Sequence, residues 1–547
     1  MQNEMNRYLK LKGITILFLM FLCVAVHAQK YEVRAVWLTT IGGIDWPRSH
    51  DAAAQKREVT ATLDRLKRAG INTVLLQTRV RASVIYPSQI EPWDLCLTGT
   101  HGRSPGYDPL RLWIDECHRR GIELHAWVVT LPVGKWKEQR CKEFVKKNPK
   151  LVKRIGDAGF MNPEDGKTGD YLARICSEIV RNYDVDGIHL DYCRYPDGWK
   201  IRISKAKGRD YITSIVRKIH DTVKGLKPWV KISCSPVGKY DDLSRYKSGG
   251  WNANTAVCQD AQGWLRTGLM DQLYPMMYFR DNQFFPFLLD WQEKSYGRTI
   301  GAGLGIYFLD PKEGRWQLSD VTRQLCVMRN EGVGQCYFRS KFLTDNVKGI
   351  YDFVSHHNRQ PALVPPVTWV RKPVPSAPTK LNLQNGTLRW RGAQNTNDSP
   401  YLVYNVYASH EYPVDTSMPE NLVAARLRAE QAQVKEGYYY AVCAVDRYGQ
   451  ESAPRQIVAS LSALTNYHSR LDVERTDGRT YYLPPKGQTL DADYVVIETL
   501  QGQQLMMCPY RGTQIDITQL PDGIYGVRSL GRKGVTHRIG QFSIKRK

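Results

Sequence analysis

The chain has 547 residues, which is too long for one ordinary hydrophobic core and suggests two to four domains. Hydrophobic residues make up 42% of it and aromatic residues 11%, a composition that indicates globular domains and excludes intrinsic disorder. The formal net charge of +23 favours anionic partners. The basic residues are scattered and form no nucleic-acid-binding motif, so we expect either a solvated basic surface or an anionic polymer as partner, and no nucleic acid.

Residues 1–28 have the pattern of a secretory signal peptide. Arg7, Lys10 and Lys12 precede the apolar run 14–26, and Ala28 offers a small residue for cleavage. This run falls short of the roughly 20 residues that span a bilayer, and no later run is long enough. We therefore expect export to the periplasm, cell surface or medium, no transmembrane segment, and a mature net charge of about +21 after the loss of three basic residues and one acidic residue.

Short β-branched or aromatic runs alternate with amphipathic helical stretches over residues 30–360. The expected strands are residues 33–40, 73–79, 123–130, 187–192, 231–237, 272–279, 299–308 and 334–338. The expected helices are residues 56–68, 109–120, 170–183, 210–226, 287–296, 319–330 and 346–353. Such alternation predicts βαβ units and a parallel sheet, and eight strands fit a (β/α)8 TIM barrel. A doubly wound open sheet is the competing fold, but no Gly-rich phosphate loop follows the first strand.

Prolines between residues 361 and 378 predict a stiff linker, after which short strands begin. The strands expected in the next unit, 379–463, are residues 380–383, 388–390, 402–408, 438–446 and 456–461. Trp390 followed by tyrosine-rich strands resembles a fibronectin type III sandwich.

A last β domain is expected over residues 467–547. Its expected strands are residues 493–499, 514–517 and 523–527. The turn at 498–502 and the segment 520–525 resemble the C-terminal domains that direct Bacteroidetes proteins through type IX secretion. This resemblance implies a contact with the cell envelope or the secretion machinery, and a small β-sandwich without an address function is the alternative.

Cysteine usage indicates neither a disulfide framework nor a zinc site. One of the twelve cysteines, Cys23, leaves with the signal peptide, and the remaining odd number is scattered without a CxxC motif. We expect no metal ion or other cofactor.

The reactive groups of a (β/α)8 barrel lie where its strands end. The fourth expected strand ends at Asp191, and His189 shares its face because residues two apart on a strand point the same way. Burial of an acid at the end of an apolar strand is costly unless the acid is paired or works at a site. Arg194 is near enough to pair with Asp191, so anchoring of the loop is the alternative to catalysis.

Other strand ends and the loops after them predict a sugar-binding cleft, because aromatic rings stack on sugar C–H faces while polar groups bind hydroxyls. The expected substrate-binding residues are Trp46, Gln77, Arg79, His125, Trp127, His189, Arg194, Tyr195, Tyr274, Tyr278 and Tyr307. The two histidines lack a metal-ligand spacing, so we interpret them as hydrogen-bonded pocket residues.

Glycoside hydrolysis usually requires two carboxyl groups. Asp191 is the first, as nucleophile or base, and Asp260 after the fifth strand is the preferred proton donor. A helix-capping role is the alternative for Asp260. Asp271, Asp45 and Asp241 are the other candidates.

A set of ordered motifs over about residues 30–360 resembles the glycosyl-hydrolase-like family 10 domain. The motifs include Val33-Arg-Ala-Val-Trp-Leu38, Leu76-Gln-Thr-Arg79, His125-Ala-Trp127 and Asp186-Gly-Ile-His-Leu-Asp-Tyr-Cys-Arg-Tyr-Pro196. The resemblance implies a barrel glycoside hydrolase, and some members are associated with peptidoglycan glycan strands stripped of their stem peptides. Tyr192 stands where many relatives have a second Asp, and Cys193 stands where family 18 chitinases have their acid. This strand therefore does not supply both acids.

We thus expect an exported glycoside hydrolase that acts on an amino-sugar polymer. Two alternatives stay open. One is a non-catalytic cell-surface protein that binds glycan, and the other is a hydrolase of dietary or host polysaccharide.

Overall fold

The computed structural model describes residues 29–457, apart from 245, 247, 249 and 436, together with 479–482, 494–499, 504–509, 514–530 and 536–544. The expected signal peptide lies outside these residues. The chain divides into two compact units, the first with the barrel and the two sheets that follow it, the second with the C-terminal strands. Within the described residues, no helix has the length and apolar character needed to cross a membrane.

Eight parallel strands close into a barrel in the order β1-β11-β10-β9-β8-β7-β3-β2. The barrel strands are β1 (Arg34–Leu38), β2 (Thr73–Arg79), β3 (Glu123–Val129), β7 (Gly187–Asp191), β8 (Lys231–Cys234), β9 (Gln272–Leu273), β10 (Thr299–Leu304) and β11 (Gly334–Tyr337). Each lies within one of the eight expected runs, which confirms the predicted (β/α)8 fold.

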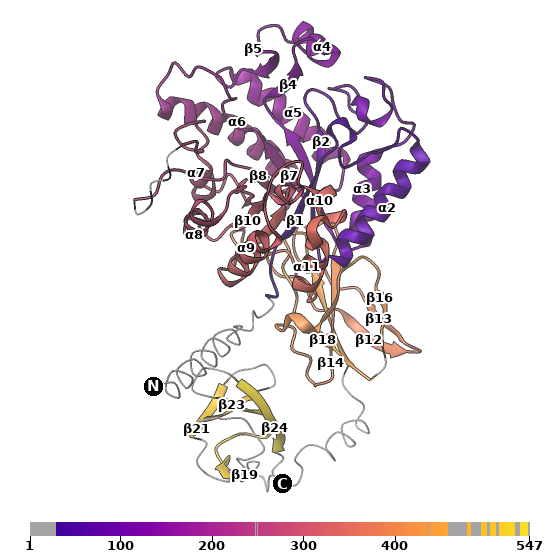
Figure 1. Cartoon of the computed structure of the whole chain (residues 1–547). Coiled ribbons are helices and arrows are strands. Elements are labelled where there is room, and N and C mark those ends of the chain that lie inside the picture. The colour runs from indigo at the N-terminus through magenta and orange to yellow at the C-terminus, as the bar shows by residue number, and fades with distance from the viewer. Residues whose placement is uncertain are drawn as a thin grey trace, which may run out of the picture. The chain divides into compact units, whose positions relative to one another are not determined.

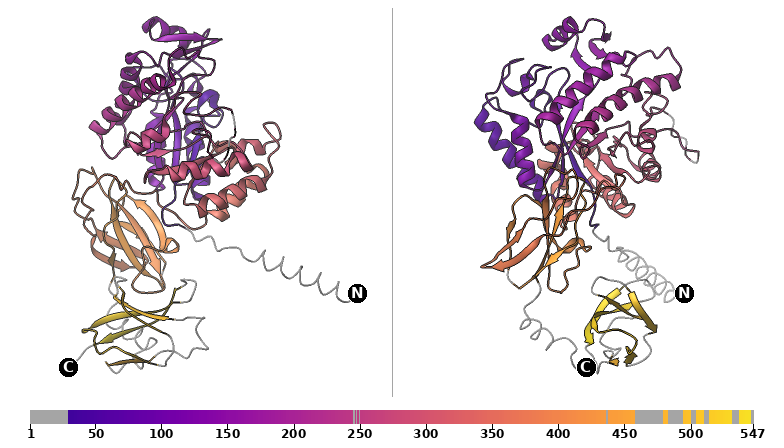
Figure 2. Two further views of the ribbon diagram at one scale, coloured as in Figure 1. Left: turned by 90° about the vertical axis from the view of Figure 1, so that its left-hand side faces the viewer. Right: turned by 180° about the vertical axis from the view of Figure 1, so that it is seen from behind.

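Helices surround this barrel (Figures 1 and 2). They are α2 (Ala52–Arg68), α3 (Pro109–Arg119), α5 (Gly166–Asn182), α6 (Lys205–Leu226), α7 (Ala261–Arg266), α8 (Phe285–Glu293), α9 (Leu318–Asn330), α10 (Ser340–Thr344) and α11 (Ile350–His357). Polar side chains fix several of their starts, because they accept the N–H groups that a first helical turn leaves unpaired. The capping residues with such a bond include Asp51, Asp108, Asp165, Ser204 and Asp260.

Alternate residues of the barrel strands face inward or toward the helices. Trp37, Leu75, Trp127 and Tyr274 belong to the inward-facing core, which is separate from the larger core between strands and helices. Glycines on neighbouring strands make room for the large rings. A Cβ atom on Gly187, for example, would lie 2.5 Å from Nδ1 of His125.

An insertion between β3 and α5 has no counterpart among the expected elements. It consists of β4 (Pro132–Lys135), α4 (Gln139–Lys147), β5 (Val152–Ile155) and β6 (Ala158–Met161), with sheet order β4-β6-β5. Lys and Arg outnumber Asp and Glu by nine to three in residues 132–161. The insertion follows the carboxyl end of β3, so it borders the mouth of the barrel. Figure 1 shows it at the end remote from the sheets of residues 379–456.

Two antiparallel sheets follow the barrel, with orders β12-β13-β16 and β15-β14-β17-β18. Their strands are β12 (Thr379–Gln384), β13 (Thr387–Arg391), β14 (Val403–Ser409), β15 (Leu422–Leu427), β16 (Gln431–Gln433), β17 (Tyr439–Val445) and β18 (Arg455–Gln456). Trp390 of one sheet packs on Tyr404 of the other, with ring centroids 5.4 Å apart. We call this region the two-sheet domain.

The two-sheet domain covers the amino end of the barrel strands, where it forms buried ion pairs. Arg426 contacts Glu123 at 2.9 Å and Asp186 at 2.7 Å, and Arg447 contacts Asp186 at 3.1 Å. Backbones also meet here, since a Cβ on Gly121 (φ +68°) would lie 2.3 Å from the carbonyl oxygen of Ala425. The barrel and the two-sheet domain therefore share one interior.

The start of the described chain and the segment predicted as a linker also lie against this junction. Leu363 donates its N–H to the carbonyl of Lys30 at 2.8 Å, and Trp369 donates to Asp271 at 2.8 Å. Glu451 accepts from Lys30 at 2.5 Å and from Tyr31 at 3.0 Å. The segment 361–378 is thus packed along part of its length.

The second unit is a small antiparallel β structure, considered by itself. Its strands are β19 (Thr480–Tyr482), β20 (Tyr494–Thr499), β21 (Gln504–Pro509), β22 (Gln514–Asp516), β23 (Gly523–Leu530) and β24 (Thr536–Ile544). They form sheets of order β21-β20-β23-β24 and β19-β22, with Ile497, Val527 and Phe542 in the core. The role of this unit as a sorting domain stays a prediction.

Candidate active site

Asp191 is the last residue of β7, and it accepts hydrogen bonds from three directions. Its Oδ1 accepts from the Ser235 hydroxyl at 2.8 Å and from the Tyr192 N–H at 2.8 Å. Its Oδ2 accepts from Nε1 of Trp127 at 3.2 Å. Amide and indole N–H groups can only donate, so this arrangement holds both oxygens as acceptors and orients the carboxylate.

Nearby donors and charges offset only part of the cost of burying the negative charge of Asp191. Burial raises the pKa of Asp191 above its ordinary value, while the Ser235 and Tyr192 hydrogen bonds and the charge of Arg194 act in the opposite direction. The side chain is only slightly exposed, at the mouth where barrel enzymes place reactive groups. A raised pKa makes the ionised carboxylate a stronger proton acceptor.

Tyr192 turns the chain sharply after Asp191. It has a φ of 55°, a left-handed conformation that is uncommon for a residue with a Cβ. Tyr192 as a whole is 38% exposed. The guanidinium carbon of Arg194 lies 5.0 Å from the centroid of the Tyr192 ring and 4.6 Å from that of Trp251, which is 46% exposed. Arg194 thus lies between two exposed rings beside Asp191.

Half-buried aromatic residues gather at the ends of β9, β10 and β11. Tyr278 stacks on Phe338 with centroids 5.3 Å apart and meets Tyr307 edge-on at 5.7 Å. Burial raises the pKa of Tyr278, and the charge of Asp191 adds to the shift. Burial likewise raises the pKa of Tyr307, to about 12, so both phenols stay neutral at physiological pH.

The predicted histidines lie deeper than the barrel mouth. His189 is fully buried, where its Nε2 accepts from Trp37 at 3.0 Å and its Nδ1 lies 3.0 Å from the Ser233 hydroxyl. Burial lowers the pKa of His189, so its ring is neutral. His125 is also fully buried, 3.2 Å from Glu123. Neither ring has a surface that a substrate could contact in this conformation.

Four more predicted binding residues are buried against protein partners. Arg79 pairs with Glu91 at 2.7 Å, and Tyr274 donates to Gln272 at 3.0 Å. Trp46 donates to the Gln55 carbonyl at 3.2 Å. Gln77 accepts from the N–H groups of Thr40 and Ile41 at 2.9 and 2.8 Å. These contacts hold the loops after β1 and β2.

Asp260 has the contacts of a helix cap. Its Oδ1 accepts from the Gly263 N–H at 3.2 Å at the start of α7, and from the Tyr240 hydroxyl at 2.6 Å. These contacts are the ones expected if Asp260 caps the helix, which is the alternative to its role as proton donor. The catalytic role of Asp260 stays a prediction.

The other candidate acids are likewise engaged. Asp45 pairs with Arg339, Asp241 accepts from Asn254 at 2.7 Å, and Asp271 pairs with Lys224 at 2.7 Å. Asp271 precedes β9, so it lies at the amino end of the strands, away from the mouth. A further half-buried carboxylate, Glu164, precedes α5 and accepts from the hydroxyl of Tyr195 at 3.4 Å.

Sequence reasoning missed Ser235 and Trp251 at the mouth and one further carboxylate, Glu164. Ser235 follows β8, and its alignment beside Asp191 is a signal that the pairing of expected strands could have given. Glu164 lies just before α5, which begins at Gly166, four residues earlier than the sequence predicts. Trp251 lies in a long loop without periodicity, where no sequence signal places it at the mouth.

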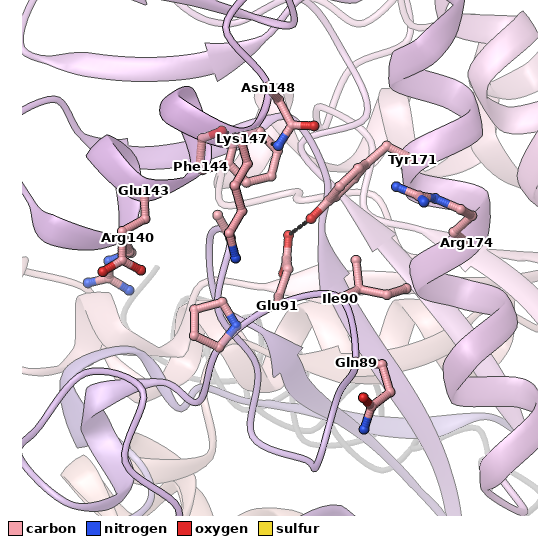
Figure 3. Close-up of a pocket in the computed structure, with 12 residues that line it drawn as sticks. Gln89, Ile90, Glu91, Arg140, Glu143, Phe144, Lys147, Asn148, Tyr171 and Arg174 are labelled. Carbon is pink, nitrogen blue, oxygen red and sulfur yellow. Dashed lines mark hydrogen bonds between the residues drawn. The ribbon is translucent and has the colours of Figure 1, made fainter.

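A separate pocket of about 300 Å³ lies beside the barrel (Figure 3). The loop after β2, α4 and α5 line it with Glu91, Arg140, Lys147, Tyr171 and Arg174 among others, and none of the predicted site residues belongs to it. Tyr171 donates to Glu91 at 3.0 Å. Within the described residues, no group of three His, Cys, Asp or Glu side chains is arranged to hold a metal ion.

Comparisons with known proteins indicate the class of enzyme to which the barrel is similar. Residues 32–206 and 199–301 match the family Glycosyl hydrolase-like 10. The chain is 28% identical over 489 residues to the glycosyl hydrolase YngK of Bacillus subtilis, covering 77% of this chain and 92% of YngK. It is 29% identical over 287 residues to the glycosyl hydrolase DigH of Escherichia coli K12, covering 45% of this chain and 65% of DigH. The chain is therefore a glycoside hydrolase by class.

Its barrel is a glycosyl hydrolase-like 10 domain. Among solved structures, the PgaB (BpsB) glycoside hydrolase domain from Bordetella bronchiseptica is similar with a TM-score of 0.43 and 13% identity, over 59% of this chain and 98% of that domain.

Proposed function

We propose that this chain is an exported glycoside hydrolase that cleaves an amino-sugar polymer, namely peptidoglycan glycan strands without stem peptides. The observation that carries the proposal is the environment of Asp191. A buried carboxylate with a raised pKa lies at the barrel mouth, held by three donors and flanked by aromatic rings. The resemblance of the barrel motifs supports the choice of substrate.

In the proposed reaction Asp191 acts as nucleophile or base. Trp127, Ser235 and the Tyr192 N–H fix its orientation. The neutral aromatic residues Tyr278 and Tyr307 supply the faces on which a sugar ring stacks. A second carboxyl group must protonate the leaving oxygen. Asp260 is the candidate that the sequence predicts, and Glu164 is a second candidate because it contacts Tyr195, which lies in the loop after Asp191.

Release of reducing ends from purified, peptide-free glycan strands tests the proposal. We expect the unmodified protein to release them and Asp191→Asn to lose this activity while it keeps its circular dichroism spectrum. Asp260→Asn and Glu164→Gln, measured in parallel, identify the proton donor, because only the donor variant regains rate on a substrate with an activated leaving group that needs no protonation. Full activity in Asp191→Asn would overturn the assignment.

A second candidate function is binding of glycan without cleavage. The contacts of Asp260 favour it, because a carboxylate that caps a helix and accepts from Tyr240 is not free to deliver a proton. Tyr192 in place of a second acid favours it as well. Retention of the protein on glycan strands without release of any reducing ends would support binding alone. Cleavage of a panel of dietary or host polysaccharides, but not of glycan strands, would support the third possibility.

A further inference from the structure

We propose that Tyr192, Arg194 and Trp251 form a subsite next to Asp191 that binds a sugar carrying a carboxylate group. The inference rests on the proposed function and narrows its substrate to an acidic glycan. The rings of Tyr192 and Trp251 would stack on the sugar, and the guanidinium of Arg194 would bind its carboxylate. Peptidoglycan strands freed of their stem peptides expose one such carboxylate per disaccharide, and uronic acid polymers carry the same group.

The position of Arg194 is the first support for this subsite. Its guanidinium carbon lies 5.0 Å from the Tyr192 centroid and 4.6 Å from the Trp251 centroid, within the range of a cation–π contact with each ring. A planar guanidinium suits a carboxylate, because two parallel N–H groups can bind both oxygens. Tyr192 and Trp251 are exposed residues, at 38% and 46%, which leaves surface for a ligand.

The incomplete pairing of Arg194 is the second support. The side chain is 95% buried by area, and its Nε atom has no hydrogen-bond partner among the described residues. Nη1 contacts Asp197 at 3.1 Å, but the Asp197 side chain is 69% exposed. Because Asp197 lies on the solvent side of this pair, a substrate carboxylate that reaches the mouth could take its place beside Nη1.

The charge of the surroundings is the third support. The insertion of residues 132–161 borders the mouth, with nine basic residues against three acidic ones. Lys153 of this insertion lies 4.9 Å from the ring centroid of Trp199, in the loop that follows Asp191. An anionic strand that reaches Asp191 would therefore run along a positively charged border, which raises its local concentration.

The test compares substrates that differ only in the carboxylate. Peptide-free glycan strands are used either unmodified or after conversion of their carboxylates to neutral methylamides, and kcat/KM is measured for both. We expect the unmodified protein to prefer the carboxylate form by about tenfold or more, the scale of one charge-assisted hydrogen bond. We expect Arg194→Gln to bring this ratio near one, Arg194→Lys to keep part of it, and Trp251→Ala to lower kcat/KM for both substrates.

A purely structural role for Arg194 would lower both rates equally and leave the ratio unchanged, and that result would overturn the proposal. Lys146→Gln is the matched control, because it removes one positive charge from the insertion without touching the subsite; we expect its ratio to stay within about twofold of the original. A thermal melt of each variant checks that it folds. If Arg194→Gln does not fold, the Arg194→Lys ratio decides.

Binding separates this proposal from the proposed hydrolysis. Calorimetry with Asp191→Asn measures the affinity for both forms of the strand without any cleavage. A preference for the carboxylate form supports the subsite even if the unmodified protein cleaves nothing, and equal affinity overturns it even if cleavage occurs. A uronic acid polymer in the same titration distinguishes the source of the carboxylate. If the protein binds this polymer as tightly as the glycan strand, the subsite recognises the carboxylate and no other part of the sugar.

Discussion

The two ends of β7 carry buried aspartates five residues apart whose environments are opposite. Asp186, just before the strand, contacts His118 and Arg426 at 2.7 Å and Arg447 at 3.1 Å. Burial alone would raise the pKa of Asp186, but these charges hold it well below its ordinary value. Asp191, at the other end, has no such set of cations, and burial raises its pKa.

The difference separates a structural carboxylate from a reactive one. At the amino end of the barrel the charge is paired by His118 of α3 and by two arginines of the two-sheet domain, so it joins two parts of the fold. At the mouth the charge is oriented by neutral donors and left partly uncompensated, so it keeps its reactivity. Pairs of carboxylates with pKa values pushed apart by their environments often have different roles in one enzyme.

Neutralising Asp191 is the strongest test of the difference between the reactive and the structural aspartate. We expect Asp191→Asn to lower the rate of glycan hydrolysis by about 10²–10⁴-fold, since an oriented proton-transfer group contributes about that much. Its melting temperature should stay within about 5 °C, because no buried ion pair is lost. Reducing-end release and a thermal melt measure the two effects. A large loss of stability with activity retained would make Asp191 the structural aspartate.

Neutralising Asp186 should have the opposite effect. We expect Asp186→Asn to lower the free energy of unfolding by about 3–5 kcal/mol, because it removes the buried carboxylate that His118, Arg426 and Arg447 share and leaves each arginine only its second partner. The specific activity of the folded protein should not change. Denaturant unfolding measures the loss. Asp184→Asn is the control, with an expected loss below about 1 kcal/mol because Asp184 is partly exposed.

The stability that Asp186 contributes should depend on pH. Because the pKa of Asp186 is lowered in the folded state, its stabilisation is present above the pKa of an unfolded aspartate, about 3.9, and is lost as the pH falls below that value. We therefore expect the stability difference between the unmodified protein and Asp186→Asn to be largest near neutral pH and to shrink below about pH 4. Denaturant midpoints at several pH values test this, and a constant difference would contradict it.

The smallest expected effect comes from Ser235. Removal of a donor to the ionised carboxylate destabilises the anion, so Ser235→Ala should raise the pKa of Asp191 further. We expect the acidic limb of the pH profile of kcat/KM to move up by about one pH unit. Ser233→Ala is the matched control, because Ser233 contacts His189 and not Asp191. Equal shifts in both variants would argue against the hydrogen bond as the cause.

Much of the barrel could be predicted from the sequence, because every strand has a short apolar run followed by an amphipathic helix. The insertion of residues 132–161 was not predicted, since its strands have only four residues each and its helix only nine. In the site, the alternation of side chains along a strand predicts that His189 points to the same side as Asp191, but it does not predict how far His189 lies below the barrel mouth. A strand rises about 3.3 Å per residue, so a residue two positions earlier lies about 7 Å deeper. The place of Trp251 depends on a loop path that no local pattern encodes.

The contact of Lys30 and Tyr31 with Glu451 has a consequence for the order of folding. The Tyr31–Glu451 bond joins residues 420 positions apart, and β1 follows directly after it. A chain that emerges amino end first must therefore hold its first strand without these partners until nearly the whole first unit has followed. Contacts of such long range form late and slow the folding of a domain. If the chain is exported as proposed, this contact favours passage of the unfolded chain across the membrane, with closure of the barrel afterwards.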